Sequence, residues 1–362
     1  MIPKLRVSLP AREDRSYDIT FLPSISSLVE DLRRKYLHRQ LFVLSDTTVS
    51  KLHAREVCRR LQKLRVDANL LSVPPGEKSK TRKTKERVED RLLMSGAERN
   101  STIFGFGGGV IGDLAGFVAA TLHRGVPYVQ IPTTLLAQVD SSIGGKVAVD
   151  HPLGKNLIGA FYQPKEVYIV AEFLATLPDR EFRNGMAEVI KYAAIMDKTL
   201  FVTLEKNVGK ILKRETRLLF PIVRRCCCLK KTVVELDEKE SGLRRILNFG
   251  HTIAHALERM TSYRISHGEA VAIGMVAETK ISASHGLLSV KECARLQRLV
   301  RAFGLPSDIP RSTDLRKLLK ETLSDKKLIN GVVHYTLLRQ LGKAEVGIPL
   351  TTDEALHHLQ ER

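Results

Sequence analysis

Short apolar runs alternate with turn residues through the first half of the chain. Runs at residues 41–44, 70–73, 102–106 and 126–131 each end in polar or turn residues such as Ser, Pro, Gly and Thr. Each run predicts a buried strand, and the longer segments between them predict helices. We therefore expect an α/β half with a parallel sheet, in which ligands bind at the carboxyl ends of the strands.

The pattern changes in the second half of the chain. From about Phe182 onward, amphipathic helical segments dominate and strand signals are few. We place a domain boundary near Pro178, which predicts an α/β domain over residues 1–178 and a mostly α-helical domain over 179–362. The chain shows no repeats and no low-complexity linker.

A glycine-rich turn joins the third apolar run to a helical segment at residues 114–121. Its sequence is Gly107-Gly108-Gly109-Val110-Ile111-Gly112-Asp113. Glycine lets the backbone approach an anion closely, and the first N–H groups of the following helix have no intrahelical partners. The turn predicts a phosphate or dinucleotide site in a Rossmann-like domain, although a tight structural turn would produce the same short motif.

The turn departs from the ordinary dinucleotide fingerprint in two ways. The glycines follow the third predicted strand rather than the first, and no acidic residue lies about 20 residues downstream to hold a ribose. Asp46 or Glu77, at the ends of earlier strands, could take that role.

Histidines in the second half indicate a metal site. Asn248, His251 and His255 are spaced i, i+3 and i+7, on one face of a predicted helix, and His267 follows a short turn. Glu188 lies on another predicted helix. Zinc accepts imidazole nitrogen and carboxylate oxygen. Spacing does not decide which two of the three histidines bind, and His251 with His255 at i, i+4 is the simplest pair.

Composition is that of a globular protein with room for about two domains. Hydrophobic residues make up 43% of the 362 residues, and no apolar run approaches the ~18 residues of a membrane span. The start of the chain lacks an apolar signal core, so we expect a cytoplasmic protein with no membrane partner. The run Cys226-Cys227-Cys228 predicts buried or free thiols in a reducing compartment.

The formal net charge of +18 raises the alternative of nucleic-acid binding. Lysine and arginine crowd residues 78–91, but no aromatic residues interleave with them and no known binding module is present. A solvated helix face explains the crowding equally well. We expect no nucleic-acid partner, and we expect the positive potential to attract a small anionic substrate.

Five longer motifs make the chain resemble the 3-dehydroquinate synthase family, over most of its length from Asp46 to Lys327. The motifs are Gly-Gly-Gly-Val-Ile-Gly-Asp at 107–113, Ile-Pro-Thr-Thr-Leu-Leu-Ala-Gln-Val-Asp-Ser-Ser-Ile-Gly-Gly-Lys at 131–146, Gly-Lys-Asn-Leu-Ile-Gly-Ala-Phe at 154–161, Gly-Met-Ala-Glu-Val-Ile-Lys-Tyr at 185–192 and Leu-Asn-Phe-Gly-His-Thr at 247–252. The resemblance implies a zinc ion bound by Glu188, His251 and His267, with Co²⁺ as a possible substitute. His255 is then left beside the metal.

The resemblance also implies the residues that hold cofactor and substrate. NAD would be held by Asp46, Glu77, Lys80, Gly108, Gly109, Asp113, Thr133 and Thr134. The substrate would be held by Arg124, Asp140, Lys146, Lys155, Asn156, Lys191, Lys230, Arg244, Asn248 and one of Lys326 and Lys327. Lysine and arginine suit a substrate with a carboxylate and a phosphate, because charge-assisted hydrogen bonds are the strong ones.

Two local arguments bear on these lysines. Lys146 and Lys155 lie in glycine-rich, otherwise apolar stretches, where a cation without a partner would be costly. Glu188 and Lys191 are spaced i, i+3 and share a helix face, so they could join metal to substrate. The alternative for that pair is a surface ion pair of little energetic weight.

The implied activity is a phosphate-eliminating ring closure in the shikimate pathway. The substrate of the family is 3-deoxy-D-arabino-heptulosonate 7-phosphate, and the product is 3-dehydroquinate. NAD oxidises a ring hydroxyl transiently, phosphate is eliminated, the hydroxyl is restored and an intramolecular aldol step closes the carbocycle. His255 is the candidate for proton handling near the metal-bound hydroxyls. We also expect a homodimer.

The chain departs from the family pattern beside Lys146. Where Thr-Gly-Val-Asn is expected, residues 147–150 are Val-Ala-Val-Asp, and Thr48 stands where asparagine is common. Neither change removes a ligand or a charge. Other sugar phosphate cyclases and glycerol-dehydrogenase-like metal enzymes are the competing enzyme classes.

Overall fold

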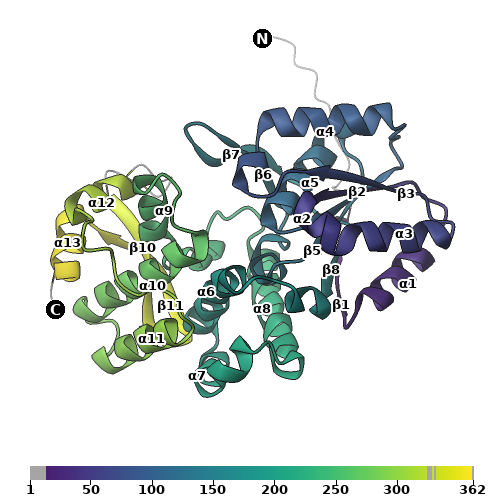
Figure 1. Cartoon of the computed structure of the whole chain (residues 1–362). Coiled ribbons are helices and arrows are strands. Elements are labelled where there is room, and N and C mark those ends of the chain that lie inside the picture. The colour runs from purple at the N-terminus through teal and green to yellow at the C-terminus, as the bar shows by residue number, and fades with distance from the viewer. Residues whose placement is uncertain (1–13, 324–327, 330–331, 361–362) are drawn as a thin grey trace, which may run out of the picture.

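A sheet-containing half and a helical half lie side by side, as Figure 1 shows. The computed structural model describes residues 14–323, 328–329 and 332–360. The helices α6 (Asp179–Met196) and α8 (Thr216–Leu236) lie where the two halves meet. No helix within these described ranges is long and apolar enough to cross a membrane.

The first half is built on a six-stranded parallel sheet with the strand order β1-β8-β5-β4-β2-β3. Its strands are β1 (Asp18–Leu22), β2 (Leu41–Asp46), β3 (Ala68–Val73), β4 (Thr102–Gly107), β5 (Tyr128–Pro132) and β8 (Glu166–Val170). All four predicted strands are present. Every residue of β2, β4, β5 and β8 is buried, because helices cover both faces of the sheet.

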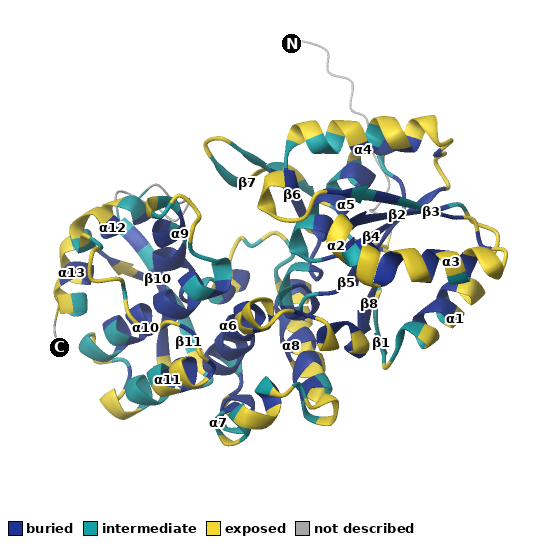
Figure 2. Ribbon diagram, in the orientation of Figure 1, coloured by how far each residue is buried: buried dark blue, intermediate teal, exposed yellow. Residues whose placement is uncertain are grey.

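Helices pack on both faces of the sheet. Buried residues of α1 (Ile25–Tyr36) and α3 (Arg55–Lys63) form a core on one face, and those of α4 (Arg82–Met94) and α5 (Gly109–Thr121) form a core on the other. Figure 2 shows the exposed sides of α1, α3 and α4 facing outward. The short helical turns are α2 (Thr47–Val49), η1 (Ser50–Ala54), η2 (Glu77–Ser79), η3 (Leu122–Arg124), η4 (Ala137–Ser141), η5 (Ala171–Ala175) and η6 (Leu243–Asn248).

An antiparallel hairpin of β6 (Lys146–His151) and β7 (Gly154–Phe161) projects from this half (Figure 1). Val147, one of the departures from the family pattern, is buried where β6 packs on α5. A Cβ atom on Gly116 of α5 would lie 2.3 Å from Val147 Cγ1, so the glycine makes room for the valine. The valine at this position therefore has a packing role.

The second half contains eight helices among its described residues. Besides α6 and α8 they are α7 (Lys198–Leu212), α9 (His251–Met260), α10 (His267–Ser284), α11 (Val290–Ala302), α12 (Leu315–Thr322) and α13 (Thr352–Gln360). The mostly helical prediction is confirmed, but an antiparallel sheet was missed. Its strands are β9 (Leu328–Ile329), β10 (Val332–Gln340) and β11 (Lys343–Leu350), and Gly342, with φ of 88°, turns the chain between the last two.

One hydrophobic core crosses the predicted domain boundary. It joins Val167 and Ile169 of β8 to the buried faces of α6, α7, α8 and α10. Pro178 directly precedes α6, whose central residues are buried almost all round. The division at Pro178 stays a proposal.

Candidate active site

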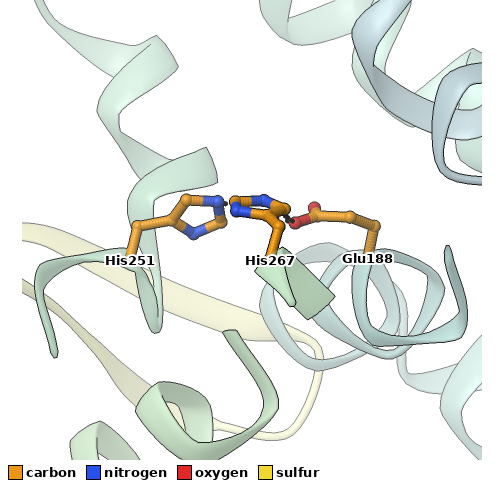
Figure 3. Close-up of side chains that lie close together, drawn as sticks. All are labelled: Glu188, His251 and His267. Atoms are coloured by element: carbon orange, nitrogen blue, oxygen red, sulfur yellow. Dashed lines mark ion pairs between the residues drawn. The ribbon is translucent and has the colours of Figure 1, made fainter. Parts of the chain in front are cut away.

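Glu188, His251 and His267 meet where three helices converge (Figure 3). Glu188 lies within α6, His251 is the first residue of α9 and His267 is the first residue of α10. The Nε2 atoms of both histidines lie 3.5 Å from Glu188 Oε1. One ligand atom from each residue lies within 4.8 Å of the others, and no other such trio occurs among the described residues.

The Glu188 carboxylate has the environment of a metal ligand. Its side chain is 0% exposed and forms an ion pair with Lys191, but neither oxygen takes part in a hydrogen bond within the part of the chain that the structure describes. One ion pair compensates only part of the cost of burying a carboxylate without hydrogen bonds, and a divalent cation would offset more of it. Two imidazole nitrogens and one carboxylate oxygen suit zinc with a position left open for substrate.

His255 lies beside the trio rather than within it. Its ring centroid is 5.5 Å from that of His251, with the two ring planes at 87°. The rings of His251 and His267 are 5.3 Å apart. The two separations are nearly equal, but only His251 and His267 converge with Glu188 among the described residues, which favours them over the simplest pair that spacing offered.

Glycines let the helices that carry these ligands pack backbone against backbone. A Cβ atom on Gly268 would lie 2.2 Å from the carbonyl oxygen of Asn184, and the Gly268 N–H donates to Asn184 Oδ1 at 2.5 Å. A Cβ atom on Gly274 would lie 1.9 Å from the carbonyl oxygen of Gly250. These close approaches fix α10 against α6 and against the start of α9.

Hydrogen bonds orient the His251 ring. The buried carboxylate of Glu278 accepts the backbone N–H of Gly250 at 2.6 Å and that of Ile253 at 3.4 Å, which anchors the start of α9. His251 Nδ1 lies 3.1 Å from the carbonyl oxygen of Phe249. With Nδ1–H donating to that carbonyl, the lone pair of Nε2 is directed toward Glu188, an arrangement typical of metal-binding histidines.

Glu258 is a site residue that the motifs did not reveal. Its buried carboxylate oxygen Oε1 lies 3.6 Å from His267 Nδ1 and accepts a hydrogen bond from Lys155 Nζ at 3.2 Å. Burial alone would raise the pKa of Glu258, but His267, Lys155 and His255 lower it to about 2. The signal was available, because Glu258 lies at i+3 from His255 and i+7 from His251 on the predicted histidine face.

A second buried cluster adjoins the trio. Lys191 forms an ion pair with Glu188, and its side chain is 2% exposed, so this is no surface pair. Asp140 Oδ1 accepts hydrogen bonds from Tyr192 at 2.6 Å and from Lys230 Nζ at 2.8 Å. Burial lowers the pKa of Lys230; burial would raise the pKa of Asp140, but Lys230, Lys191 and Tyr192 lower it.

Glu240 and the backbone of Gly144 contact three predicted substrate residues, which are Lys146, Arg244 and Asn248. Lys146 forms an ion pair with Glu240, and Asn248 Nδ2 donates to Glu240 Oε1 at 2.9 Å. The guanidinium of Arg244 donates to the carbonyl oxygen of Gly144 at 3.3 Å. Glu240 was not among the predicted site residues, and its φ of 59° is unusual outside glycine.

Two details of the sequence argument are wrong here. The Lys146 side chain is 48% exposed, so the cost of burying an unpaired cation does not apply to it. Asn248 ends η6, and α9 begins only at His251, so Asn248 does not share a helix face with the histidines. A turn at Phe249 and Gly250, where φ of Gly250 is 80°, separates the two segments.

The structure does not bring Arg124, another predicted substrate residue, to the glycine turn. Arg124 follows the carboxyl end of α5, whereas Gly108 and Gly109 lie at its amino end, roughly 20 Å away for a helix of this length. Lys326 and Lys327 lie outside the described residues. Their roles stay predictions.

The glycine turn lies where the strand order of the sheet reverses, between β2 and β4. Gly108 is the N-cap of α5 and Gly109 its first residue, so the helix begins earlier than the predicted segment. A Cβ atom on Gly108 would lie 3.1 Å from Thr134 Cγ2. Asp46 ends β2, and its Oδ1 accepts the N–H groups of Thr48 and Val49, which leaves Oδ2 for a ligand. The carboxyl edge of such a sheet is the usual place for a nucleotide.

Thr133 carries an unpaired hydroxyl at this edge. Its Oγ1 is buried and has no hydrogen-bond partner within the described ranges, whereas Thr134 Oγ1 accepts the N–H of Ala137 at 3.1 Å. Buried hydroxyls are normally paired, so a polar group of a bound nucleotide fits the Thr133 position.

Lys80 connects the sheet edge to the hairpin. Its Nζ donates to Asp113 Oδ2 and to Asn156 Oδ1, each at 2.5 Å. Asp150, another departure from the family pattern, accepts the backbone N–H of Asn156 at 2.9 Å. Burial raises the pKa of both Glu77 and Asp113, and the charge of Lys80 offsets only part of that rise.

A parallel sheet with a phosphate-suited turn, next to a buried Glu-His-His trio, defines a nucleotide- and metal-dependent enzyme. Residues 70–184 match the family model described as 3-dehydroquinate synthase N-terminal, and residues 185–328 match the one described as 3-dehydroquinate synthase C-terminal. The chain therefore belongs to the 3-dehydroquinate synthase family, as its motifs predicted.

Similar proteins agree over nearly the full length. The chain is 48% identical over 345 residues to the 3-dehydroquinate synthase of Pelobacter propionicus, covering 95% of this chain and 96% of that protein. It is 43% identical over 360 residues to the enzyme of Thermodesulfovibrio yellowstonii, covering 99% of both.

Solved structures of sugar phosphate cyclases have the same fold. The 2-epi-5-epi-valiolone synthase of Streptomyces hygroscopicus, with NAD⁺ and Zn²⁺ bound, matches with a TM-score of 0.90 at 29% identity and covers 98% of both chains. A 2-deoxy-scyllo-inosose synthase complexed with carbaglucose-6-phosphate, NAD⁺ and Co²⁺ matches with a TM-score of 0.84 at 27% identity, covering 95% of this chain and 96% of its own. A glycerol dehydrogenase from Schizosaccharomyces pombe, at 16% identity, shares the fold alone.

Proposed function

We propose that the chain is a 3-dehydroquinate synthase that converts 3-deoxy-D-arabino-heptulosonate 7-phosphate to 3-dehydroquinate and phosphate. The observation that carries the proposal is the Glu188–Lys191 pair, in which one buried helix face joins a metal ligand to a cation suited to an anionic substrate. Family membership supports it. On this proposal the enzyme is a carbon-oxygen lyase.

The cofactors are NAD and a divalent ion, zinc by preference with cobalt as a substitute. Glu188, His251 and His267 would hold the metal, and the edge of the sheet from Asp46 to Thr134 would hold NAD. When bound, NAD takes up and returns one hydride, and the metal polarises the adjacent substrate hydroxyls. The Glu188 oxygens and the Thr133 hydroxyl have no hydrogen-bond partner among the described residues, and this makes the two residues fit the two groups.

The substrate is bound by cations that already have carboxylate partners. Lys155 contacts Glu258 and Lys146 contacts Glu240, so a phosphate or carboxylate of the substrate must compete with a protein carboxylate for each lysine. Because the chain carries a net charge of +18, its positive potential favours the anion in that competition. We propose that the remaining substrate residues are Asn156, Asp140, Lys191, Lys230, Arg244 and Asn248, together with Arg124 and one of Lys326 and Lys327.

His255 is the residue we assign to proton handling. It lies on α9, one turn after His251, with its ring edge-to-face to that of the proposed metal ligand. This position brings an imidazole beside the hydroxyls that the metal would polarise, without making it a ligand.

The decisive experiment measures phosphate release with NAD supplied well below the substrate concentration. Phosphate should exceed NAD many times over, without steady accumulation of free NADH, because the hydride returns to the same substrate. A dehydrogenase instead leaves one reduced cofactor behind per turnover. NADH rising in proportion to product would overturn the proposal.

The identity of the ring and of the metal needs two further measurements. To distinguish this enzyme from other sugar phosphate cyclases, the substrates of those cyclases are tested as well. 3-Dehydroquinate should form only from 3-deoxy-D-arabino-heptulosonate 7-phosphate. Chelation should abolish phosphate release, and added zinc should restore it. Turnover by fully metal-free protein would count against the assignment.

A further inference from the structure

A second pair of histidines lies at the opposite end of α10 from His267. His285 is the C-cap of α10, and His358 lies on the C-terminal helix α13. His285 Nδ1 is 3.4 Å from His358 Nε2, and the ring planes are at 90° with centroids 5.4 Å apart. Figure 1 shows α13 near α10, in the half of the molecule away from the parallel sheet.

The distance between these nitrogens matches a shared metal ion. Two nitrogens bound to one tetrahedral zinc at about 2.0–2.1 Å lie roughly 3.3–3.4 Å apart. A metal could therefore replace the hydrogen bond between the rings with little movement of either helix. Imidazole nitrogens favour zinc, nickel and copper over magnesium or calcium.

Neighbouring groups support such a site. Ser284 Oγ lies 2.6 Å from His358 Nδ1, so a proton on Nδ1 can be donated to the hydroxyl and the Nε2 lone pair is then directed at His285. Glu354 lies one turn before His358 on α13, and its pKa is lowered chiefly by its hydrogen bonds to Thr351, with smaller contributions from His285 and His358. The carboxylate adds a negative charge near both rings.

We propose that His285 and His358 form a second divalent transition-metal site, completed by water and distinct from the trio at Glu188. The bound ion links the end of α10 to α13. Because α10 begins at His267, one helix then carries a metal ligand at its start and another at its C-cap.

The test is equilibrium dialysis of nickel against enzyme whose trio is already loaded with zinc, with both metals quantified. Wild-type protein should bind one additional equivalent of nickel. His285→Ala and His358→Ala should each bind it at least about 100-fold more weakly, since even loss of an outer hydrogen-bond partner typically costs 10–100-fold. Ser284→Ala, which removes the outer hydrogen-bond partner of His358, should weaken the binding of the additional nickel by about 10–100-fold.

His357→Ala is the matched control. His357 is the exposed neighbour of His358 on α13, and its ring centroid lies 5.9 Å from that of His358. This variant should keep the additional nickel, and every variant should keep the zinc and the phosphate release of the wild type. Nickel should raise the melting temperature of wild type but not of His285→Ala, whose exposed side chain can be lost without harm to the core.

Two results would overturn the proposal. One is wild-type protein that binds no nickel beyond the zinc-loaded trio. The other is additional nickel that stays bound at full affinity in both His285→Ala and His358→Ala, since the ion would then lie elsewhere.

Discussion

The cofactor edge of the sheet and the metal centre are built in different ways. The edge of the sheet where we propose that NAD binds combines the backbone of the glycine turn at 107–113 with side chains at strand ends, such as those of Asp46 and Thr133. The proposed metal centre is made of side chains from positions 188, 251 and 267 on three helices. A glycine turn can be recognised in a local motif, whereas a site built from side chains on separate helices depends on how those helices pack.

The two regions also differ in how their charges are balanced. At the cofactor edge Lys80 pairs with Asp113, so the protein alone neutralises that buried carboxylate. Lys191 likewise forms an ion pair with Glu188 in the trio. The two carboxylates differ in their hydrogen bonds, because Asp113 accepts one from Lys80 at 2.5 Å whereas neither oxygen of Glu188 takes part in one among the described residues. Glu188 is therefore the carboxylate better suited to a further cation.

The largest expected effect comes from removing a metal ligand. His251→Ala should abolish tight zinc binding and lower phosphate release by about a thousandfold, since a Lewis acid is worth several kcal/mol. NAD affinity should stay within a factor of two or so of wild type, as judged by fluorescence titration. His255→Ala is the control, and it should keep stoichiometric zinc. Zinc lost from His255→Ala but kept by His251→Ala would reverse the ligand assignment.

A methyl group on Gly268 should damage the packing that brings the ligands together. Gly268→Ala places a Cβ atom 2.2 Å from a backbone oxygen, and such overpacking should cost about 3 kcal/mol in the free energy of unfolding. Urea denaturation of the zinc-loaded protein measures it. Gly209→Ala is the matched control, because nothing lies within 4 Å of its Cβ and alanine favours a helix by about 0.5–1 kcal/mol. Equal stabilities for the two variants would contradict the packing argument.

Removing the charge of Glu258 should weaken the metal without removing a ligand. Glu258→Gln should lower zinc affinity by about 10–100-fold in a chelator competition, because the His267 ring loses its carboxylate partner. Lys155→Met serves as control, since it removes the other partner of Glu258 and should leave zinc affinity unchanged. Zinc affinity equal to wild type in Glu258→Gln would show that the carboxylate does not orient His267.

The smallest effect is expected at the cofactor edge. Thr133→Val removes a buried hydroxyl that has no partner within the described ranges, so stability without NAD should be unchanged or slightly higher. NAD affinity should fall by only about two- to tenfold, the worth of one hydrogen bond of roughly 0.5–1.5 kcal/mol. Calorimetric titration measures both this loss and the unchanged zinc affinity. A loss of stability in the absence of NAD would mean that the hydroxyl already has a partner in the protein.

Local pattern was enough to predict much of the sheet half. The four apolar runs became β2, β3, β4 and β5, because a buried parallel strand is a short continuous apolar segment. We did not predict β10 and β11, because many positions in these two paired strands are polar or half-buried. The β-branched and aromatic side chains of Val333, Tyr335 and Thr336 do favour a strand, and Val333 and Tyr335 pack on the helical core.

The candidate site was predicted unevenly for a related reason. Helical spacing suggested His251 with His255, but the packing of α10 on α6 brings His267 to Glu188 instead. That contact depends on Gly268 and Asn184, which lie 84 residues apart. Only the family resemblance pointed to the trio, and it did not point to Glu258 or Glu240.

The burial of α6 limits how enzymes of this fold can change what they make. A single helix presents the metal carboxylate of Glu188, the cation of Lys191 and the Tyr192 hydroxyl that binds Asp140, and it has almost no free face on which to absorb an altered side chain. A substitution there disturbs all three functions at once. Lys155 and Asn156 of the β6–β7 hairpin lie on β7, whose residues are exposed or half-buried, so a changed side chain meets fewer neighbours there. On the proposed function, we therefore expect changes of ring product on the hairpin rather than on the helix.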